Sequence, residues 1–204
     1  MKTVQFYNTA FIGASVLLNE MHIVASLYRE LKDWDKVKKQ VFENRLLQTR
    51  TEATAVRYFS ELKARITGLS DKQIDIITNG SIEEQKQMIW WSICKAYTFI
   101  KEFAIEIIRG KFVLFDYAIS HVDFIQFFDE KTVIDPSLAG LKDSTKKKQE
   151  QIIFRMLREA SILDKNNNII PSLLSERIIE ALKPDKPESF LVFPVTETDL
   201  RRYI

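Results

Sequence analysis

Helix-breaking residues are scarce in this sequence, which has only five glycines and five prolines among 204 residues. Glycine and proline are the residues that most strongly mark turns and helix ends. Apolar residues recur at a spacing of three or four, for example at Met21, Val24, Leu27 and Leu31, whereas the alternation typical of strands is rare. We therefore predict an all-α, mainly helical protein built as a helical bundle.

Residues that cap helix N-termini mark where the predicted helices begin, because their side chains accept from unpaired backbone N–H groups. We predict a first helix at residues 15–32 and a long helix from Ser81 to Arg109, ended by Gly110. Asp135 followed by Pro136 predicts a short helix to Leu141. The other predicted caps are Asp33, Thr51, Ser70, Ser120, Ser144 and either Ser172 or Ser175. The segment "SFLVFPV" (189–195) is predicted to be extended.

The composition changes after Gly110, where an aromatic-rich stretch begins. We place a boundary there and predict an N-terminal helical domain at residues 1–112 and a C-terminal domain at 113–204. No Ser-rich or Gly-rich linker separates them, so we expect the two parts to pack together. Residues 33–67 are predicted to include a helix-turn-helix-like unit.

The second half has the element order of a winged helix-turn-helix: helix, short helix, turn, longer helix, then a small β-hairpin at "ILDKNNNIIP" (162–171). In such modules the longer helix enters the major groove of DNA, with its N-terminal residues in contact with the bases. Lys165 and the three asparagines after it lie at the tip of the predicted hairpin, where they suit phosphate or minor-groove contacts.

Lysines crowd the start of the longer helix, in "KDSTKKKQEQIIFRML" (142–157). A helix N-terminus favours anions, so cations there are mismatched to the folded protein alone and become useful when phosphate binds. Residues 142–158 hold six Lys and Arg against two Asp and Glu, a local charge of +4. Glutamine side chains pair naturally with adenine. The predicted nucleic-acid contacts are Lys142, Ser144, Thr145, Lys146, Lys147, Lys148, Gln149, Gln151, Arg155 and Lys165.

A similar but weaker pattern lies in "QTRTEATAVRYFSELKARITGL" (48–69). This segment and Arg45 just before it contain five basic residues and two acidic ones. They are Arg45, Arg50, Arg57, Lys63 and Arg65, and Glu52 and Glu61. We predict that Arg50 and Arg57 contact nucleic acid. A core helix with a solvated basic face explains the same pattern equally well.

Residues for catalysis or metal binding do not cluster in the sequence. His22 and His121 are far apart, and Cys94 lies in the apolar run "WWSICKAY" (90–97). No zinc-binding spacing, phosphate-binding glycine loop or nucleophile motif occurs. We therefore predict no enzyme activity, no metal and no cofactor.

The apolar segment from Met88 to Ile108 contains Lys95, Lys101, Glu102 and Glu106. Each charge costs about 2.5–3.5 kcal/mol at the centre of a bilayer, so we predict a buried central helix and no membrane span. Residues 1–18 are apolar in part but lack a clear cleavage site, and Gln5 and Asn8 interrupt the apolar run, so we expect no signal peptide. We expect a cytoplasmic protein.

Several blocks together resemble the BrxA family of bacteriophage exclusion (BREX) defence clusters, although no single motif is diagnostic. They are "WDKVKKQVFENRLLQTRTEATAVRYFSELKARITGL", "EEQKQMIWWSICKAYTFIKEFAIEII", "DSTKKKQEQIIFRMLREASIL" and "FPVTETDLRRY". The resemblance covers the chain from about residue 7 onward. It implies an all-helical protein similar to NusB-type antitermination proteins, with nucleic-acid binding and no catalytic residues to transfer.

Together the residues and the resemblance predict a non-catalytic, double-stranded-DNA-binding accessory factor of phage defence. One alternative is an RNA-binding, NusB-like factor. The other is an adaptor that docks on other BREX subunits through "FDYAISHVDFIQFF" (115–128) or "FLVFPV" (190–195).

Overall fold

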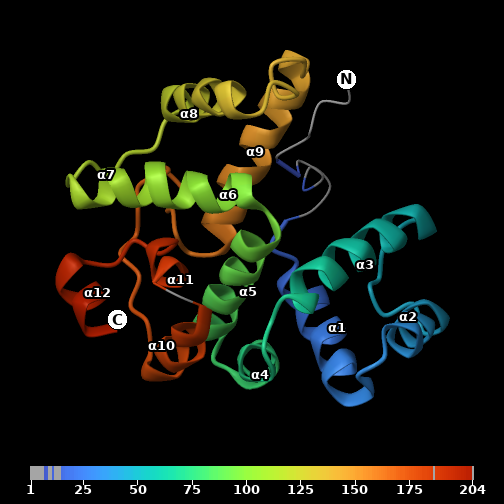
Figure 1. Ribbon diagram of the computed structural model, residues 1–204. Coiled ribbons are helices and arrows are strands. Elements are labelled where there is room, and N and C mark those ends of the chain that lie inside the picture. Colours follow the sequence, from blue (N-terminus) through green and yellow to red (C-terminus); the bar gives the residue numbers. More distant parts are fainter. Residues whose placement is uncertain (1–6, 9–10, 12–14, 186, 204) are drawn as a thin grey trace.

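The computed structural model describes residues 7–8, 11, 15–185 and 187–203. Within these ranges the chain is helical and contains no strand (Figure 1), so the all-α prediction is confirmed. The prediction that residues 1–18 are no signal peptide falls largely on residues outside these ranges. The helices are α1 (Leu18–Leu31), α2 (Trp34–Glu43), α3 (Glu52–Thr67), α4 (Asp71–Asn79), α5 (Ile82–Ala96), α6 (Thr98–Glu102), a π-helical segment (Phe103–Arg109), α7 (Gly110–Val113), α8 (His121–Ile134), α9 (Asp143–Glu159), α10 (Glu176–Leu182), a 3₁₀ turn (Lys183–Asp185), α11 (Glu188–Leu191) and α12 (Glu197–Tyr203).

Side-chain caps fix most of the helix starts that the sequence predicts. The carboxylate of Asp33 accepts from the backbone N–H groups of Asp35 and Lys36, and the Thr51 hydroxyl accepts from that of Thr54. The starts of α4, α5 and α8 are reciprocal capping boxes, and α10 begins after the Ser175 cap. These contacts span two or three residues, so the local sequence is enough to set them.

The prediction of one long helix from Ser81 to Arg109 is wrong, because the helix is interrupted at Tyr97. Tyr97 has an extended backbone, its ring packs edge-on against Phe11 at 5.5 Å, and its hydroxyl donates to the Glu61 carboxylate. The break lets α5 pack on the N-terminal helices while α6 turns in another direction, where Phe99 of α6 packs on Phe127 of α8 (Figure 1). Gly110 does not end a helix either, since it has helical dihedral angles at the start of α7.

Aromatic side chains form the centre of the core. Phe99 packs edge-on against Phe127 at 5.1 Å and against Tyr7 at 5.5 Å, and Phe103 packs against Phe127 at 5.2 Å. The buried apolar residues form one cluster that runs through both halves of the chain. The two predicted parts therefore pack together, while the boundary at residue 112 stays a prediction.

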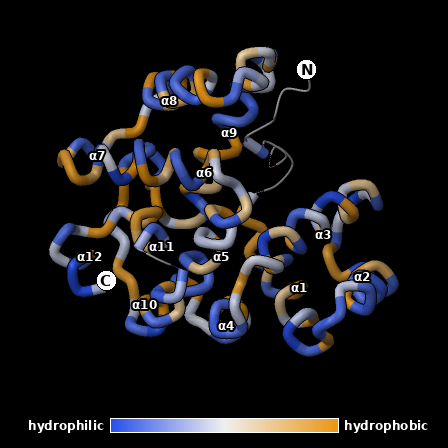
Figure 2. The backbone as a smooth tube through the Cα atoms, in the orientation of Figure 1, coloured by the Kyte–Doolittle hydropathy of each residue, from blue (hydrophilic) through white to orange (hydrophobic). Residues whose placement is uncertain are grey.

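The outer helices alternate between hydrophilic and hydrophobic residues along their length (Figure 2), as expected for helices with one buried face. The charges in residues 88–108 are paired: Lys95 with Asp185, Lys101 with Glu188, and Glu102 with Lys131. Across the described ranges, no helix combines the length and the apolar composition needed to cross a bilayer.

The segment 162–171 forms a tight turn with isolated bridges instead of the two strands of a β-hairpin. Leu163 bridges Ile169 in antiparallel fashion, and the Ile170 N–H donates to the Ile162 carbonyl at 2.9 Å. A third piece, residues 117–119, lies beside this turn, because the Ile169 N–H donates to the Tyr117 carbonyl at 2.7 Å. The paired pieces are too short to count as strands.

Two other local predictions are wrong. The residues after Asp135 form turns, because its carboxylate accepts from the Tyr7 N–H and from the backbone and hydroxyl of Ser137 instead of starting a helix. The segment 189–195, predicted to be extended, contains most of α11, which buries Phe190.

Candidate nucleic-acid interface

The lysine-bearing helix α9 begins one residue before the predicted cap. Lys142 is the N-cap, with no side-chain cap, and its carbonyl accepts from the N–H groups of Thr145 and Lys146 at 2.8 and 3.1 Å. Ser144 is therefore an exposed residue inside the helix, and its predicted capping role is wrong. Asp143 in the first turn supplies the negative charge that the helix dipole favours.

One side of α9 is exposed and basic. Its inner side buries Ile152, Ile153, Met156 and Leu157. While the acidic Asp143 and Glu159 are exposed at the two ends of the helix, the exposed residues from Ser144 to Arg158 follow the three- and four-residue spacing of a helix face and are Ser144, Lys147, Lys148, Gln151, Arg155 and Arg158. We call this set the α9 basic face. Ser144 and Gln151 are seven residues apart, so they lie near the middle of the face with cations on both sides.

Three predicted contact residues of α9 lie off this face. Gln149 is fully buried, and its side-chain amide has no hydrogen-bond partner within the described structure. Since it does not reach the surface, its predicted contact with a base is wrong. Thr145 is half-buried, and so is Lys146, whose ammonium lies 5.2 Å from the centre of the Phe128 ring.

A groove runs beside the α9 basic face, between α9, the start of α8 and the turn at 164–168. Lys147, Gln151, Arg158, His121 and Asn167 are among the residues that line it. Arg158 Nη1 donates to Asn167 Oδ1 at 2.6 Å, which holds the turn against α9. His121 Nδ1 lies 2.8 Å from Glu150 Oε1, so this carboxylate is engaged within the groove, which Asp143 also lines.

Few of the cations here are paired inside the protein. Among the described residues Lys142, Lys147 and Lys148 form no ion pair, and Arg155 lies 3.8 Å from the Glu159 carboxylate. Lys165 is exposed at the tip of the turn. The adjacent Asp164 accepts N–H groups of Asn168 and Asn166, which lowers the pKa of its carboxyl and keeps it charged. Asp164 therefore offsets the charge of Lys165, and Lys147 and Lys148 of α9 supply the net positive charge of the area.

The predicted contact residues of the first half, Arg50 and Arg57, lie at and before helix α3 and not on α9. Arg50 and Arg57 are exposed, in the turn before α3 and on α3 itself. Arg65, which the sequence places on the same basic face, is fully buried: its Nη1 donates to the carbonyls of Ser15 and Val16 at 2.9 and 3.2 Å. Glu61 is buried beside it, so these two charges do not contribute to the surface.

Arg158 and the groove partners His121 and Asn167 are additional candidates beyond the predicted site. The spacing 144, 147, 151, 155, 158 is the sequence signal that could have placed Arg158 on the basic face. The groove itself joins residues that are 29 and 9 positions apart, and no periodic pattern in the sequence shows this.

Sequence comparison identifies relatives over nearly the whole chain. A family model described as BrxA matches residues 5–186. The chain is similar to "BREX protein BrxA" of Bacillus cereus (strain H3081.97), with 30% identity over 183 residues, covering 88% of this chain and 91% of that protein. It is also similar to "BREX protein BrxA" of Escherichia coli O9:H4 (strain HS), with 22% identity over 153 residues, covering 75% and 72%.

A solved structure shares the fold. The crystal structure of an uncharacterized protein from Magnetospirillum magneticum superposes with a TM-score of 0.81 and 20% sequence identity, covering 92% of this chain and 97% of that one.

Proposed function

This chain belongs to the BrxA family, and on that premise we propose that it is a non-catalytic, DNA-binding component of a BREX phage-defence system. It acts in the cytoplasm beside other BREX subunits. The observation that carries the proposal is the α9 basic face, whose two adjacent lysines are exposed and form no ion pair among the described residues.

The order of elements around α9 supports a winged helix-turn-helix. Helices α6 and α7, the paired piece 117–119, α8, α9 and the bridged turn at 162–170 follow one another as the parts of that module do. The pairing of 117–119 with 167–169 stands where such a module has its small sheet, and the turn at 164–168 stands where it has its wing.

In this arrangement α9 lies in the major groove of a duplex. Ser144 and Gln151 point to the base edges, and Lys147, Lys148, Arg155 and Arg158 reach phosphates on either side. Because phosphate contacts dominate, the affinity falls steeply with salt, with a log-log slope near −0.9 for each neutralised phosphate. Few base contacts mean low sequence specificity.

The test is fluorescence anisotropy with random duplex DNA at low and near-physiological salt, with matched RNA as a competitor. The double variant Lys147→Glu/Lys148→Glu should lower the DNA affinity at least about tenfold, because two phosphate contacts become repulsions. Lys72→Glu/Arg201→Glu changes the net charge equally at exposed sites far along the chain from α9 and should bind as the wild type does.

Equal DNA affinity of the α9 variant and the wild type would contradict the site. Displacement of duplex DNA by RNA at equal salt would favour the RNA-binding alternative over the DNA-binding one.

A second candidate function, an adaptor role, is favoured by one observation. Leu114 and Phe115, at the turn after α7, are 77% and 80% exposed. Phe124, Phe127 and Phe128 of the same aromatic stretch, and Phe190 and Phe193 of the C-terminal segment, are buried and offer no docking surface. Co-purification with BREX subunits at high salt, compared between the wild type and Leu114→Ser/Phe115→Ser, tests this role, because an apolar contact survives salt.

A further inference from the structure

Positive charge is concentrated in two separate segments of the chain. Residues 34–67 hold eight Lys and Arg against four Asp and Glu, and residues 142–158 hold six against two, so each segment carries +4. Since the whole chain carries only +2, the remaining residues carry a net charge of −6. The first segment is therefore as strongly basic as α9, although the buried Glu61–Arg65 pair contributes nothing to it.

The cations of the first segment surround the turn between α2 and α3. Arg45 and Arg50 line a groove there, and neither forms an ion pair within the described residues; the same holds for Lys38 on α2 and Arg57 on α3. Two non-glycine residues of this turn, Arg45 and Gln48, have left-handed backbones with φ of 49° and 46°. Such conformations are uncommon and cluster at functional sites.

The exposed side of α3 carries small side chains and cations, together with Val56, which is 50% exposed, and the acidic Glu52 at the start of the helix. Ala53, Ser60 and Ala64 are exposed on the same face as Arg57, and Lys63 lies at the edge of this face in line with Val56, while Phe59, Leu62 and Ile66 form the buried face. Small side chains let a duplex approach the helix closely, so that Arg57 and Lys63 come within reach of its phosphates. Lys63 is held in place by Trp34, whose ring centre lies 5.4 Å from its ammonium.

The two basic helices meet at their C-terminal ends and diverge from there. Val16 joins them, since its N–H donates to the Glu159 carboxylate at the end of α9 and its carbonyl accepts from Arg65 near the end of α3. Each helix then extends about 24 Å, at 1.5 Å per residue, to its basic N-terminal end. Figure 1 shows these ends pointing outward in different directions.

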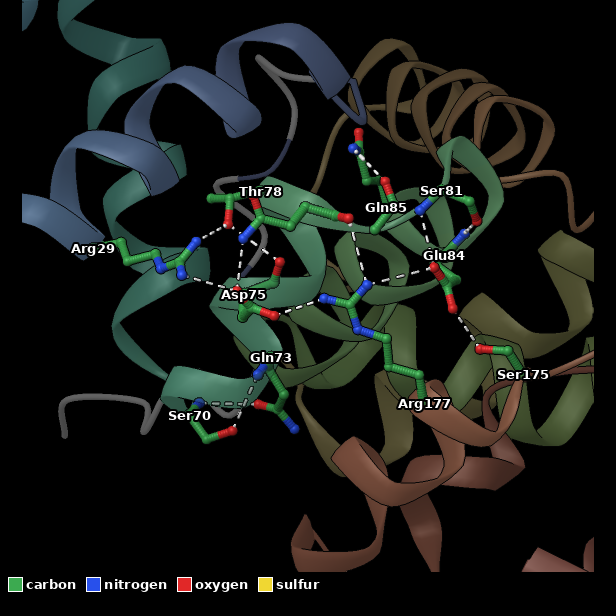
Figure 3. A network of polar contacts seen from close by, with 12 residues as sticks. Arg29, Ser70, Gln73, Asp75, Thr78, Ser81, Glu84, Gln85, Ser175 and Arg177 are labelled. Atoms are coloured by element: carbon green, nitrogen blue, oxygen red, sulfur yellow. Dashed lines mark hydrogen bonds and ion pairs between the residues drawn. The ribbon is translucent and has the colours of Figure 1, made fainter.

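The two halves are also locked together on another side. In Figure 3, Arg29 of α1 and Arg177 of α10 both point at the carboxylate of Asp75 on α4, at 3.0 and 2.6 Å. Glu84 extends this network, since it accepts from the Ser175 hydroxyl at 2.7 Å. These contacts join α1, α4 and α5 of the first half to α10 and the residue before it in the second half.

We propose that the α2–α3 turn and the exposed face of α3 form a second duplex-binding surface, so that one chain holds two segments of duplex DNA at once. This inference rests on the proposed function, which supplies the first segment at α9. Arg45, Arg50, Arg57 and Lys63 contact the phosphates of the second segment.

The experiment measures bridging with the full chain. One duplex is fixed to beads, and the retention of a labelled second duplex is measured with the wild type, Arg50→Glu/Arg57→Glu, Lys147→Glu/Lys148→Glu and the charge-matched Lys72→Glu/Arg201→Glu. Anisotropy with a single duplex and thermal melting are recorded for each variant, so that loss of folding is recognised.

We expect the wild type and the charge-matched variant to retain the second duplex. In this arrangement α9, which lies in the major groove, is the tighter of the two surfaces and dominates the affinity for a single duplex. Arg50→Glu/Arg57→Glu should therefore lose retention while its affinity for a single duplex stays within about threefold of the wild type. Unchanged retention by this folded variant overturns the second surface and leaves the proposed function standing. Absence of single-duplex binding by the wild type at low salt overturns both.

Discussion

Arg158 and Asn167 join helix α9 to the turn that follows it: Arg158 Nη1 donates to Asn167 Oδ1 at 2.6 Å. The contact places an exposed turn carrying Lys165 beside the α9 basic face. Asn167 also has a left-handed backbone, with φ of 63°. Asparagine tolerates this conformation better than other residues with a Cβ, apart from aspartate and histidine.

This backbone conformation predicts that glycine is a less destabilising replacement for Asn167 than alanine, the reverse of the order expected inside a helix. Both Asn167→Ala and Asn167→Gly lose the bond to Arg158, but alanine at positive φ adds a strain of roughly 1 kcal/mol. We therefore expect the alanine variant to be the less stable of the two in urea unfolding. If the glycine variant unfolds first, the left-handed conformation does not limit stability at this position.

Substitutions of two neighbouring lysines of α9, Lys146 and Lys147, are expected to affect different properties, the first stability and the second DNA binding. Lys146→Ala removes an ammonium that lies over the buried Phe128 ring, which should cost about 0.5–1 kcal/mol of unfolding free energy. Lys147→Ala removes an exposed charge and should leave stability unchanged while it weakens DNA binding. Urea unfolding and anisotropy on both variants check this, and equal loss of stability in both would contradict the assigned positions.

Gln149 is a site where an apolar residue should stabilise the fold. Its amide is fully buried, and neither its nitrogen nor its oxygen has a partner in the described structure. Leaving such a group unpaired costs about 1–3 kcal/mol, so Gln149→Met should raise the unfolding free energy by up to that amount. The matched change Gln151→Met, at an exposed position, should not. A destabilised Gln149→Met variant would mean that the amide is engaged.

Asp185 makes stability depend on pH in the acid range. Burial raises the pKa of its carboxyl, but hydrogen bonds from Lys95, Gln73 and Trp91 outweigh burial and hold the pKa below its usual range. Because the folded pKa is lower than the unfolded value of about 3.9, the contribution is fully present above that value and is lost as the pH falls through the folded pKa.

The variant Asp185→Asn tests this contribution. We expect it to be less stable than the wild type at neutral pH, and we expect the difference to shrink as the pH falls below about 4. Thermal melting from pH 2 to pH 7 measures both quantities. A difference that stays constant across this range would exclude the ionised carboxylate as its source.

Most of the helix starts, and the basic character of α9, follow from the sequence alone. Asp33, Thr51, Ser70, Ser81 and Ser120 cap helices with backbone groups two or three residues away, so nothing distant is needed to predict them. The apolar spacing of residues 152–157 likewise determines which side of α9 is buried.

Only the tertiary structure decided where the central helix breaks and which polar residues are buried. Tyr97 leaves the helix for partners at Phe11 and Glu61, and Arg65 is buried because the carbonyls of Ser15 and Val16 receive it. These partners lie 36 to 86 residues away in the sequence. Helical periodicity describes one element at a time, whereas such contacts exist only once the elements have packed, so the sequence predicts the helices but not the relation between its two basic surfaces.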